Sequence, residues 1–140
     1  MGGNMKAVGL LSLAAVLGSA TPASGQDVRA ARVERVQFSR GTSAATVAGR
    51  IHGYRMVDYL VGARAGQRLT VRLQTPGRFT YFVVRAPGSG DNLYDATSAE
   101  RTATLTLPAS GDYRIRVFQM RNAARRGETS NYSLTIRVDG

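Results

Sequence analysis

Short segments in which apolar and polar residues alternate fill most of the chain after Val33. The alternation is most regular in Arg68 to Gln74, Arg101 to Leu107, Tyr113 to Met120, and Tyr132 to Val138. In the first of these, Leu69, Val71 and Leu73 share one face and polar residues occupy the other. A period of two is typical of β-strands with one buried and one solvated face.

Less regular strand candidates are Val33 to Phe38, Ala45 to His52, Met56 to Ala63, and Arg78 to Arg85. Turn-forming residues such as Gly, Pro, Asn and Ser separate the segments, and no amphipathic helix of about ten residues is evident. About eight short strands with this punctuation favour an all-β fold, and within that class an antiparallel β-sandwich of jelly-roll type.

The first residues differ from the rest of the chain. A short segment ending at Lys6 carries one positive charge, Ala7 to Leu17 is apolar, and the following residues are small and polar. This order is typical of a secretory signal peptide. The apolar run is shorter than the roughly 20 residues that a membrane-spanning helix needs, so no membrane span is expected.

Small residues at Ala20, Ala23 and Gly25 offer three candidate cleavage positions. Cleavage after Gly25 divides the chain into a signal peptide, residues 1–25, and one mature domain, residues 26–140. A length of about 115 residues allows a single domain. We therefore predict a periplasmic or secreted bacterial protein.

All positively charged side chains of the mature domain, apart from its single histidine, are arginines. The whole chain has a formal charge of +10, and removal of residues 1–25 with Lys6, its only lysine, leaves +9. Guanidinium groups stay charged and match the geometry of carboxylates and phosphates. A GC-rich coding bias explains the number of arginines equally well, so a functional interpretation depends on where they cluster.

The residues that catalysis requires are scarce. His52 is the only histidine, cysteine is absent, and neither G-x-S-x-G nor H-E-x-x-H occurs. Asp91, Asn92 and Asp95 could supply oxygen ligands to calcium, but the EF-hand spacing is absent. We expect no enzyme activity, no metal site and no cofactor.

The most concentrated charge lies between the last two predicted strands, where Arg121, Arg125 and Arg126 flank two alanines. We interpret this segment as a long hairpin loop with one helical turn that places Arg121 and Arg125 on the same side. Gly127 would end the turn and leave Glu128 to pair with Arg125 or Arg126. Alternatively, the segment is a solvated loop that keeps a sheet edge soluble.

A second candidate segment, Ser110-Gly-Asp-Tyr113, precedes a predicted strand. Its residues are typical of a hairpin turn in which glycine supplies backbone freedom and Tyr113 begins the core-facing set.

Several short segments carry a family resemblance: Gly53-Tyr54, Val57-Asp58-Tyr59, Ala65-Gly66-Gln67, Ser110-Gly-Asp-Tyr113, Met120 to Glu128, and Asn131-Tyr-Ser-Leu134. In this order, across nearly the whole mature domain, they resemble the periplasmic inhibitors of g-type (goose-type) lysozyme. The arginine-rich segment is the most specific part. The S-G-D-Y turn and the A-x-A-G-Q bend also recur in other secreted β-sandwich modules, including pre-peptidase C-terminal domains.

The resemblance implies a non-enzymatic β-sandwich that binds g-type lysozyme and blocks its substrate cleft. By position, the inhibitory tyrosine and two arginines of the family correspond to Tyr54, Arg121 and Arg125. Ser110 and Tyr113 resemble an S-G-x-Y loop that related inhibitor families use. Supporting roles fall to three further residues: Arg126, Glu128 and Asp112.

An alternative function uses the same charge differently. Arg114, Arg116 and Arg137, together with the arginines of the loop, could form a broad patch on a binding module for anionic envelope polymers. Nucleic-acid binding is not expected, because the chain is exported and offers no recognition helix. The sequence leaves the oligomeric state open.

Overall fold

The computed structural model describes residues 31–88, 91–95 and 101–140. Its elements are β1 (Ala31–Arg35), β2 (Ala44–His52), β3 (Met56–Ala63), β4 (Arg68–Gln74), β5 (Thr80–Arg85), β6 (Asn92–Asp95), β7 (Thr102–Thr106), β8 (Gly111–Gln119), α1 (Arg121–Arg125) and β9 (Thr129–Asp139). The predicted signal peptide, residues 1–25, lies outside the described residues. No helix in the described ranges is long and apolar enough to span a membrane.

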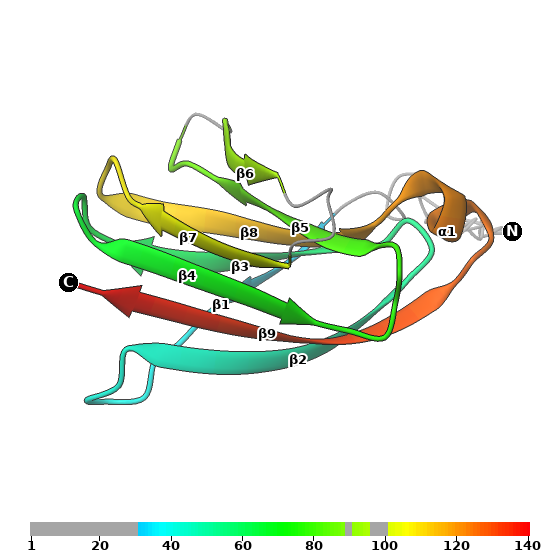
Figure 1. Cartoon of the computed structure of the whole chain (residues 1–140), viewed down its shortest axis with the longest axis horizontal. Helices are drawn as coiled ribbons and strands as arrows, with labels where there is room; N and C mark the ends of the chain where they lie inside the picture. Colours follow the sequence, from blue (N-terminus) through cyan, green and yellow to red (C-terminus); the bar gives the residue numbers. More distant parts are fainter. Residues whose placement is uncertain (1–30, 89–90, 96–100) are drawn as a thin grey trace, which may run out of the picture.

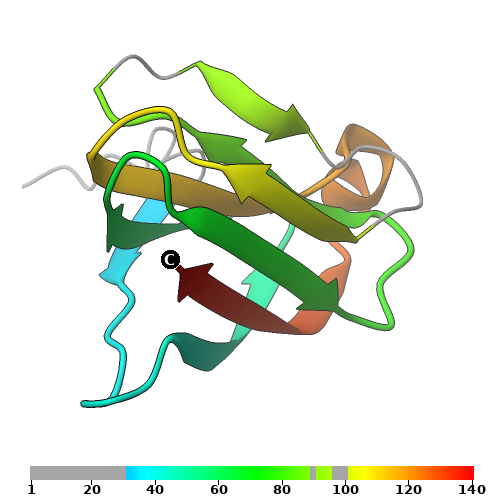
Figure 2. The same ribbon diagram turned by 60° about the vertical axis from the view of Figure 1, so that its left-hand side comes forward.

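The strands form two sheets that stack face to face (Figures 1 and 2). Sheet A has the order β1-β3-β8-β5-β6, and sheet B has the order β2-β9-β4-β7. All neighbouring strands run antiparallel except β1 and β3, which run parallel. The predicted antiparallel β-sandwich is therefore confirmed, with one parallel pair at the edge of sheet A.

Most connections carry the chain from one sheet to the other. β8 belongs to sheet A and β9 to sheet B, so the segment between them crosses the end of the sandwich. β7 and β8 likewise belong to different sheets. The prediction of hairpins at these two connections is wrong, because alternation along a strand shows which residues face the core but not which strand lies beside it.

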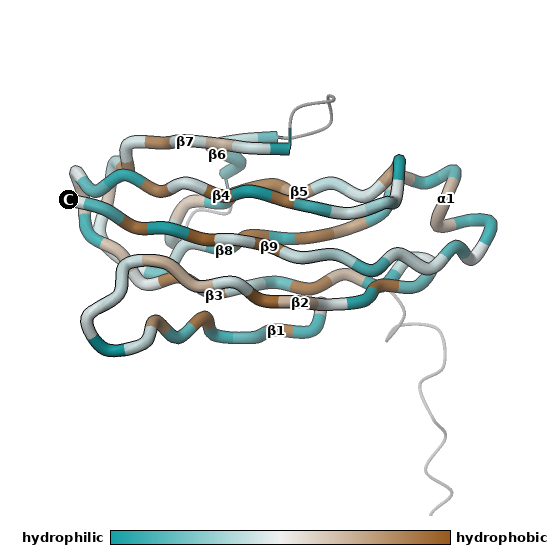
Figure 3. The backbone as a smooth tube through the Cα atoms, turned by 60° about the horizontal axis from the view of Figure 1, so that its bottom comes forward, coloured by the Kyte–Doolittle hydropathy of each residue, from teal (hydrophilic) through white to brown (hydrophobic). Residues whose placement is uncertain are grey.

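The core forms where the apolar faces of the two sheets meet. The alternation that predicted the strands also predicts their burial: Leu69, Val71 and Leu73 of β4 are buried, and residues between them are not. Figure 3 shows the same alternation of hydrophobic and hydrophilic residues along β9. Stacked faces of this kind remove apolar surface from water at about 25 cal/mol per Å², which is the main stabilising term of the fold.

Two tyrosines link the sheets through the core. The hydroxyl groups of Tyr59 in β3 and Tyr132 in β9 share a hydrogen bond of 2.5 Å, and the rings meet edge to face. Burial raises the pKa of both phenols, so both hydroxyls stay neutral and available for this bond. Opposite Tyr132, Gly49 leaves the space that the ring occupies, since a Cβ there would overlap the phenol.

One strand was not predicted. Asn92–Asp95 form β6 at the edge of sheet A, where they pair with β5. Two of the three residues that we considered as calcium ligands, Asn92 and Asp95, thus lie in a strand, and Asp91 directly precedes it. The ring of Tyr94 stacks on Phe82 of β5 at 5.5 Å between centroids. Asn and Asp are rare in strands, so the local composition indicates a loop, and only the tertiary contacts favour the strand.

Candidate functional site

The arginine-rich segment forms the short helix α1 at one end of the sandwich (Figure 1). The predicted helical turn from Arg121 to Arg125 is confirmed. Ala123 and Ala124 are buried, so the helix lies with its alanine side against the protein. Arg121 and Arg125 are exposed on the other side. The two small residues thus allow close packing that holds the arginines at the surface.

Gly127 ends the helix, as predicted. Its amide donates to the carbonyl of Ala124 at 3.0 Å, and the amide of Glu128 donates to the carbonyl of Ala123 at 3.1 Å. These two bonds define a Schellman motif, which requires the left-handed conformation that Gly127 adopts with φ +68°. The motif satisfies carbonyl groups at the helix end and returns the chain toward β9.

The charged pair after the helix is Arg126 with Glu128, at 2.6 Å. This settles the choice that the sequence left open between Arg125 and Arg126. The guanidinium of Arg126 also lies 5.9 Å from the ring centroid of Phe79. Glu128 and Phe79 therefore fix the position of the Arg126 side chain. Neither Arg121 nor Arg125 has an ion-pair partner within residues 31–88, 91–95 and 101–140.

Tyr54 lies in the turn that leads from β2 to β3. The amide of Arg55 donates to the carbonyl of His52 at 3.1 Å and closes the turn, with Gly53 at φ +59° in its first central position. The amide of Gly53 donates to the carbonyl of Glu128 at 2.9 Å, which ties the turn to the segment after α1. Tyr54 remains 39% exposed.

Gln119, the last residue of β8, joins the turn and the helical segment. It is only 9% exposed, and its side-chain amide donates to the carbonyl of Glu128 at 2.8 Å and to that of Gly53 at 3.3 Å. Our reading of the sequence missed this role. The available signal was a polar residue at an inward position of β8, after Tyr113, Ile115 and Val117, since a buried amide needs hydrogen-bond partners.

These contacts bring the predicted tyrosine and arginines together. A shallow depression with a volume of about 490 Å³ is lined by Tyr54, Met56, Phe118, Gln119, Arg121 and Arg125. Arg121 and Arg125 each offer a planar fork of five N–H donors, suited to carboxylates. The tyrosine ring and the two neighbouring apolar side chains supply contact area beside them. The depression suits an acidic group carried on a larger partner.

Ser110 and Tyr113 do not join this depression. Tyr113 lies near the start of β8 and Ser110 directly before that strand, whereas α1 follows its end. Tyr113 is fully buried, donates to the carbonyl of Ala109 at 2.6 Å and so cannot contact a partner. The hydroxyl of exposed Ser110 accepts from the amide of Ala65 at 2.9 Å. We therefore correct our assignment: Tyr113 is a core residue, and its hydroxyl holds the turn before β8.

Asp112, predicted as a supporting residue, is also remote from α1. Its carboxylate accepts two hydrogen bonds from Arg35, at 3.0 and 2.7 Å, and these bonds lower the pKa of the carboxyl group. Both side chains are about half exposed, so the pair adds little stability. Its contribution is to hold the start of β8 against β1.

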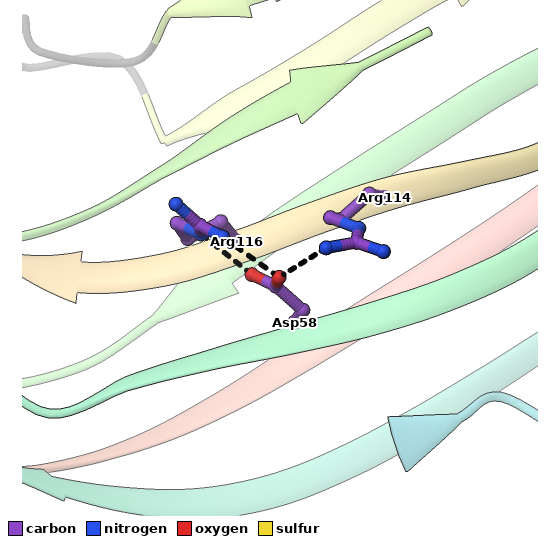
Figure 4. A network of polar contacts seen from close by, with 3 residues as sticks. All are labelled: Asp58, Arg114 and Arg116. Carbon is purple, nitrogen blue, oxygen red and sulfur yellow. Dashed lines mark hydrogen bonds and ion pairs between the residues drawn. The ribbon is translucent and has the colours of Figure 1, made fainter. Parts of the chain in front are cut away.

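The three strand arginines of the alternative function do not gather in one patch. Arg114 and Arg116 of β8 both reach the buried carboxylate of Asp58 in β3, with three hydrogen bonds of 2.7 to 3.0 Å (Figure 4). These bonds raise the pKa of Arg116. Arg137 lies on sheet B, where it pairs with Asp139. Arg114 and Arg116 therefore lie on sheet A and Arg137 on sheet B, and each of the three has a counter-ion.

The described residues contain no group of three or more His, Cys, Asp or Glu side chains that could hold a metal ion. His52, the only histidine, shares a hydrogen bond of 2.7 Å through Nδ1 with the hydroxyl of Thr129, next to the turn that carries Tyr54. It thus helps to hold the end of β2 against the start of β9.

Fold and site together define a small β-sandwich binding protein whose candidate binding surface lies at one end. Over 136 residues the chain is 35% identical to the inhibitor of g-type lysozyme of Escherichia coli K12, covering 95% of this chain and 94% of that protein. The chain belongs to the family of inhibitors of g-type lysozyme. No family model matches it.

Solved structures agree with this assignment. PliG of Aeromonas hydrophila, a periplasmic inhibitor of g-type lysozyme, is 34% identical with a TM-score of 0.73, over 77% of this chain and 96% of that chain. PliG of Salmonella Typhimurium is 30% identical with a TM-score of 0.64, over 79% of this chain and all of that chain. The pre-peptidase C-terminal domain of a Bacillus anthracis collagenase, at 14% identity and a TM-score of 0.60, over 78% of this chain and 98% of that chain, shares the fold alone.

Proposed function

We propose that this chain inhibits g-type lysozyme and that the depression around Tyr54, Arg121 and Arg125 is its contact surface. The observation that carries the proposal is that these three residues, from two distant parts of the chain, line one depression. They are the residues that the family resemblance selects. The inhibitor acts in the periplasm, after cleavage of residues 1–25 releases the domain of residues 26–140.

The chemistry follows from how a muramidase works. Its acidic residues lie at the base of a saccharide-binding cleft and act as general acid and as stabiliser of the reacting sugar. Arg121 and Arg125 reach these carboxylates with charge-assisted hydrogen bonds and occupy the lone pairs that the reaction needs. The ring of Tyr54 fills the neighbouring space where a sugar would bind. The same contact therefore blocks proton transfer and excludes the substrate.

Rigidity favours such a contact. Arg121 and Arg125 stand on a helix whose alanine side is buried, and Tyr54 stands on a turn that Gln119 ties to the segment directly after that helix. A partner therefore meets side chains whose backbone is already ordered. Preorganisation of this kind lowers the entropic cost of binding.

The experiment is a turbidity assay of bacterial cell walls with lysozymes of the goose, chicken and invertebrate types. The purified protein is expected to suppress lysis by the goose-type enzyme and to leave the other two active at the same concentration. Equal suppression of all three would refute the assignment of a specific contact with g-type lysozyme, and so would a failure to suppress the goose-type enzyme.

A further inference from the structure

The outer face of sheet A carries two arginines directly opposite each other. In the antiparallel register of β5 and β8, Arg85 pairs with Arg114. Side chains in such positions have Cβ atoms only about 5 Å apart, and like charges there destabilise a sheet. The neighbourhood must therefore supply negative charge or leave the two guanidinium groups in repulsion.

Within the described part of the chain, the paired carboxylates of Asp58 and Asp112 meet only part of this need. Asp58 accepts one hydrogen bond from Arg114 and two from Arg116, so one carboxylate serves two guanidinium groups (Figure 4). Asp112 is engaged in its pair with Arg35. Among the described residues Arg85 forms no ion pair. The face thus holds an excess of positive charge at the Arg85 position.

Arg85 also has an unsatisfied donor. Its Nε atom is buried and has no hydrogen-bond acceptor in the part of the chain that the structure describes. A buried donor without a partner destabilises the fold, so it marks a place where an acceptor is missing.

Both arginines line a hollow. Its volume is about 330 Å³, and its lining residues are Leu60, Arg85, Ala86, Gly88, Asp112 and Arg114. It shares no residue with the depression around Tyr54. The space is sufficient for a small polyatomic ion together with part of the molecule that carries it.

We propose that Arg85 and Arg114 form a second binding site, which takes one oxyanion group, a carboxylate or a phosphate. Two guanidinium forks on adjacent strands match the several lone pairs of such a group, and the bound charge relieves their repulsion. Leu60, Ala86 and Gly88 provide an apolar and backbone wall for the group's neighbouring atoms. The site does not depend on the proposed inhibitory function.

Two sources can supply the oxyanion. One is a free solute of the cell envelope, and the other is an acidic side chain of the bound lysozyme. Along β8, Arg114 lies four residues before Phe118, which lines the depression around Tyr54, a separation of about 13 Å. An interface of about 800 Å² per partner spans more than this distance. The second source alone depends on the proposed function.

The test is an NMR titration of the protein with inorganic phosphate, and separately with acetate, at constant ionic strength maintained with chloride. Saturable shifts are expected for the backbone amides of Leu60, Ala86 and Gly88. Arg85→Gln should weaken the affinity about tenfold, because a charge-assisted contact is lost. The matched control is Arg72→Gln, which removes the same charge from an exposed position on sheet B.

Shifts that do not saturate would overturn the proposal, as would equal weakening in the two variants. Binding of each variant to goose-type lysozyme then identifies the source. If Arg85→Gln has a higher Kd for lysozyme than Arg72→Gln, the oxyanion is a lysozyme side chain. If the two Kd values are equal, the oxyanion is a solute. If lysozyme binds neither wild type nor variants, the proposed function fails, while the phosphate titration still decides the oxyanion site.

Discussion

Replacing both Arg121 and Arg125 by alanine is expected to raise the Kd for g-type lysozyme by about 100-fold or more, with a matching loss of inhibition. Each arginine offers charge-assisted hydrogen bonds worth about 1.5 to 3 kcal/mol, and removing both leaves the lysozyme carboxylates buried and unpaired. The fold should persist, because both side chains are exposed and alanine is the best helix former. Inhibition assays and thermal unfolding of the same preparations measure the two effects.

The matched control is Arg68→Ala with Arg72→Ala. These arginines are also exposed and four residues apart, but they lie on β4 of sheet B. The control removes the same charge, so it isolates the local contact from the long-range field of the protein. Equal loss in the two double variants would mean that total charge, rather than the depression around Tyr54, governs binding.

The second large effect concerns stability. Asp58→Asn is expected to lower the free energy of unfolding by about 2 to 4 kcal/mol, because it leaves Arg114 and Arg116 facing a buried neutral amide. Partial exposure of both guanidinium groups keeps the effect below that of a fully buried pair. For a domain of this size, the melting temperature should fall by roughly 10 °C.

Asp139→Asn provides the comparison. Asp139 pairs with Arg137 at 3.0 Å, but both side chains are about half exposed, so the expected loss is within about 0.5 kcal/mol. Denaturant unfolding of the two variants measures the difference directly. Similar stabilities for Asp58→Asn and Asp139→Asn would show that the buried network in Figure 4 contributes no more than a surface ion pair.

The periodicity of the sequence predicts much of the fold, because burial on one face of a strand depends on local alternation. The inward sets Leu69, Val71 and Leu73 of β4, and Tyr113, Ile115 and Val117 of β8, are buried as predicted. Sheet membership is not a local property. The supposed hairpin before β9 is instead a crossing between sheets, and the period of two is the same in both arrangements.

The helical turn of α1 could be predicted for a related reason. The spacing of Arg121 and Arg125 and the position of Gly127 are local signals, and the structure bears both out. Proximity of Tyr54 is not local, since it depends on hydrogen bonds from Gln119 and Gly53 to the segment after the helix. From the sequence, only the family resemblance predicted that Tyr54 lies beside the arginines. The structure places the three residues around one depression.

The resemblance misled at the other end of β8. The motif Ser110-Gly-Asp-Tyr113 suggested a lysozyme contact, yet Tyr113 is buried and its hydroxyl is bound to the backbone of Ala109. The alternation of β8 itself assigns Tyr113 to the inward face with Ile115. Where a motif and the period of a strand disagree, burial follows the period, because a side chain cannot leave the core without loss of its apolar contacts.

A double-mutant cycle tests the central claim most directly. It measures Kd for wild type and Arg121→Ala against a goose-type lysozyme and against the same enzyme with its catalytic carboxylate changed to the amide. If Arg121 contacts that carboxylate, the two changes are coupled by at least about 1.5 kcal/mol. Additive effects, within about 0.5 kcal/mol, would place Arg121 away from the catalytic residue and contradict inhibition by occupation of the active site.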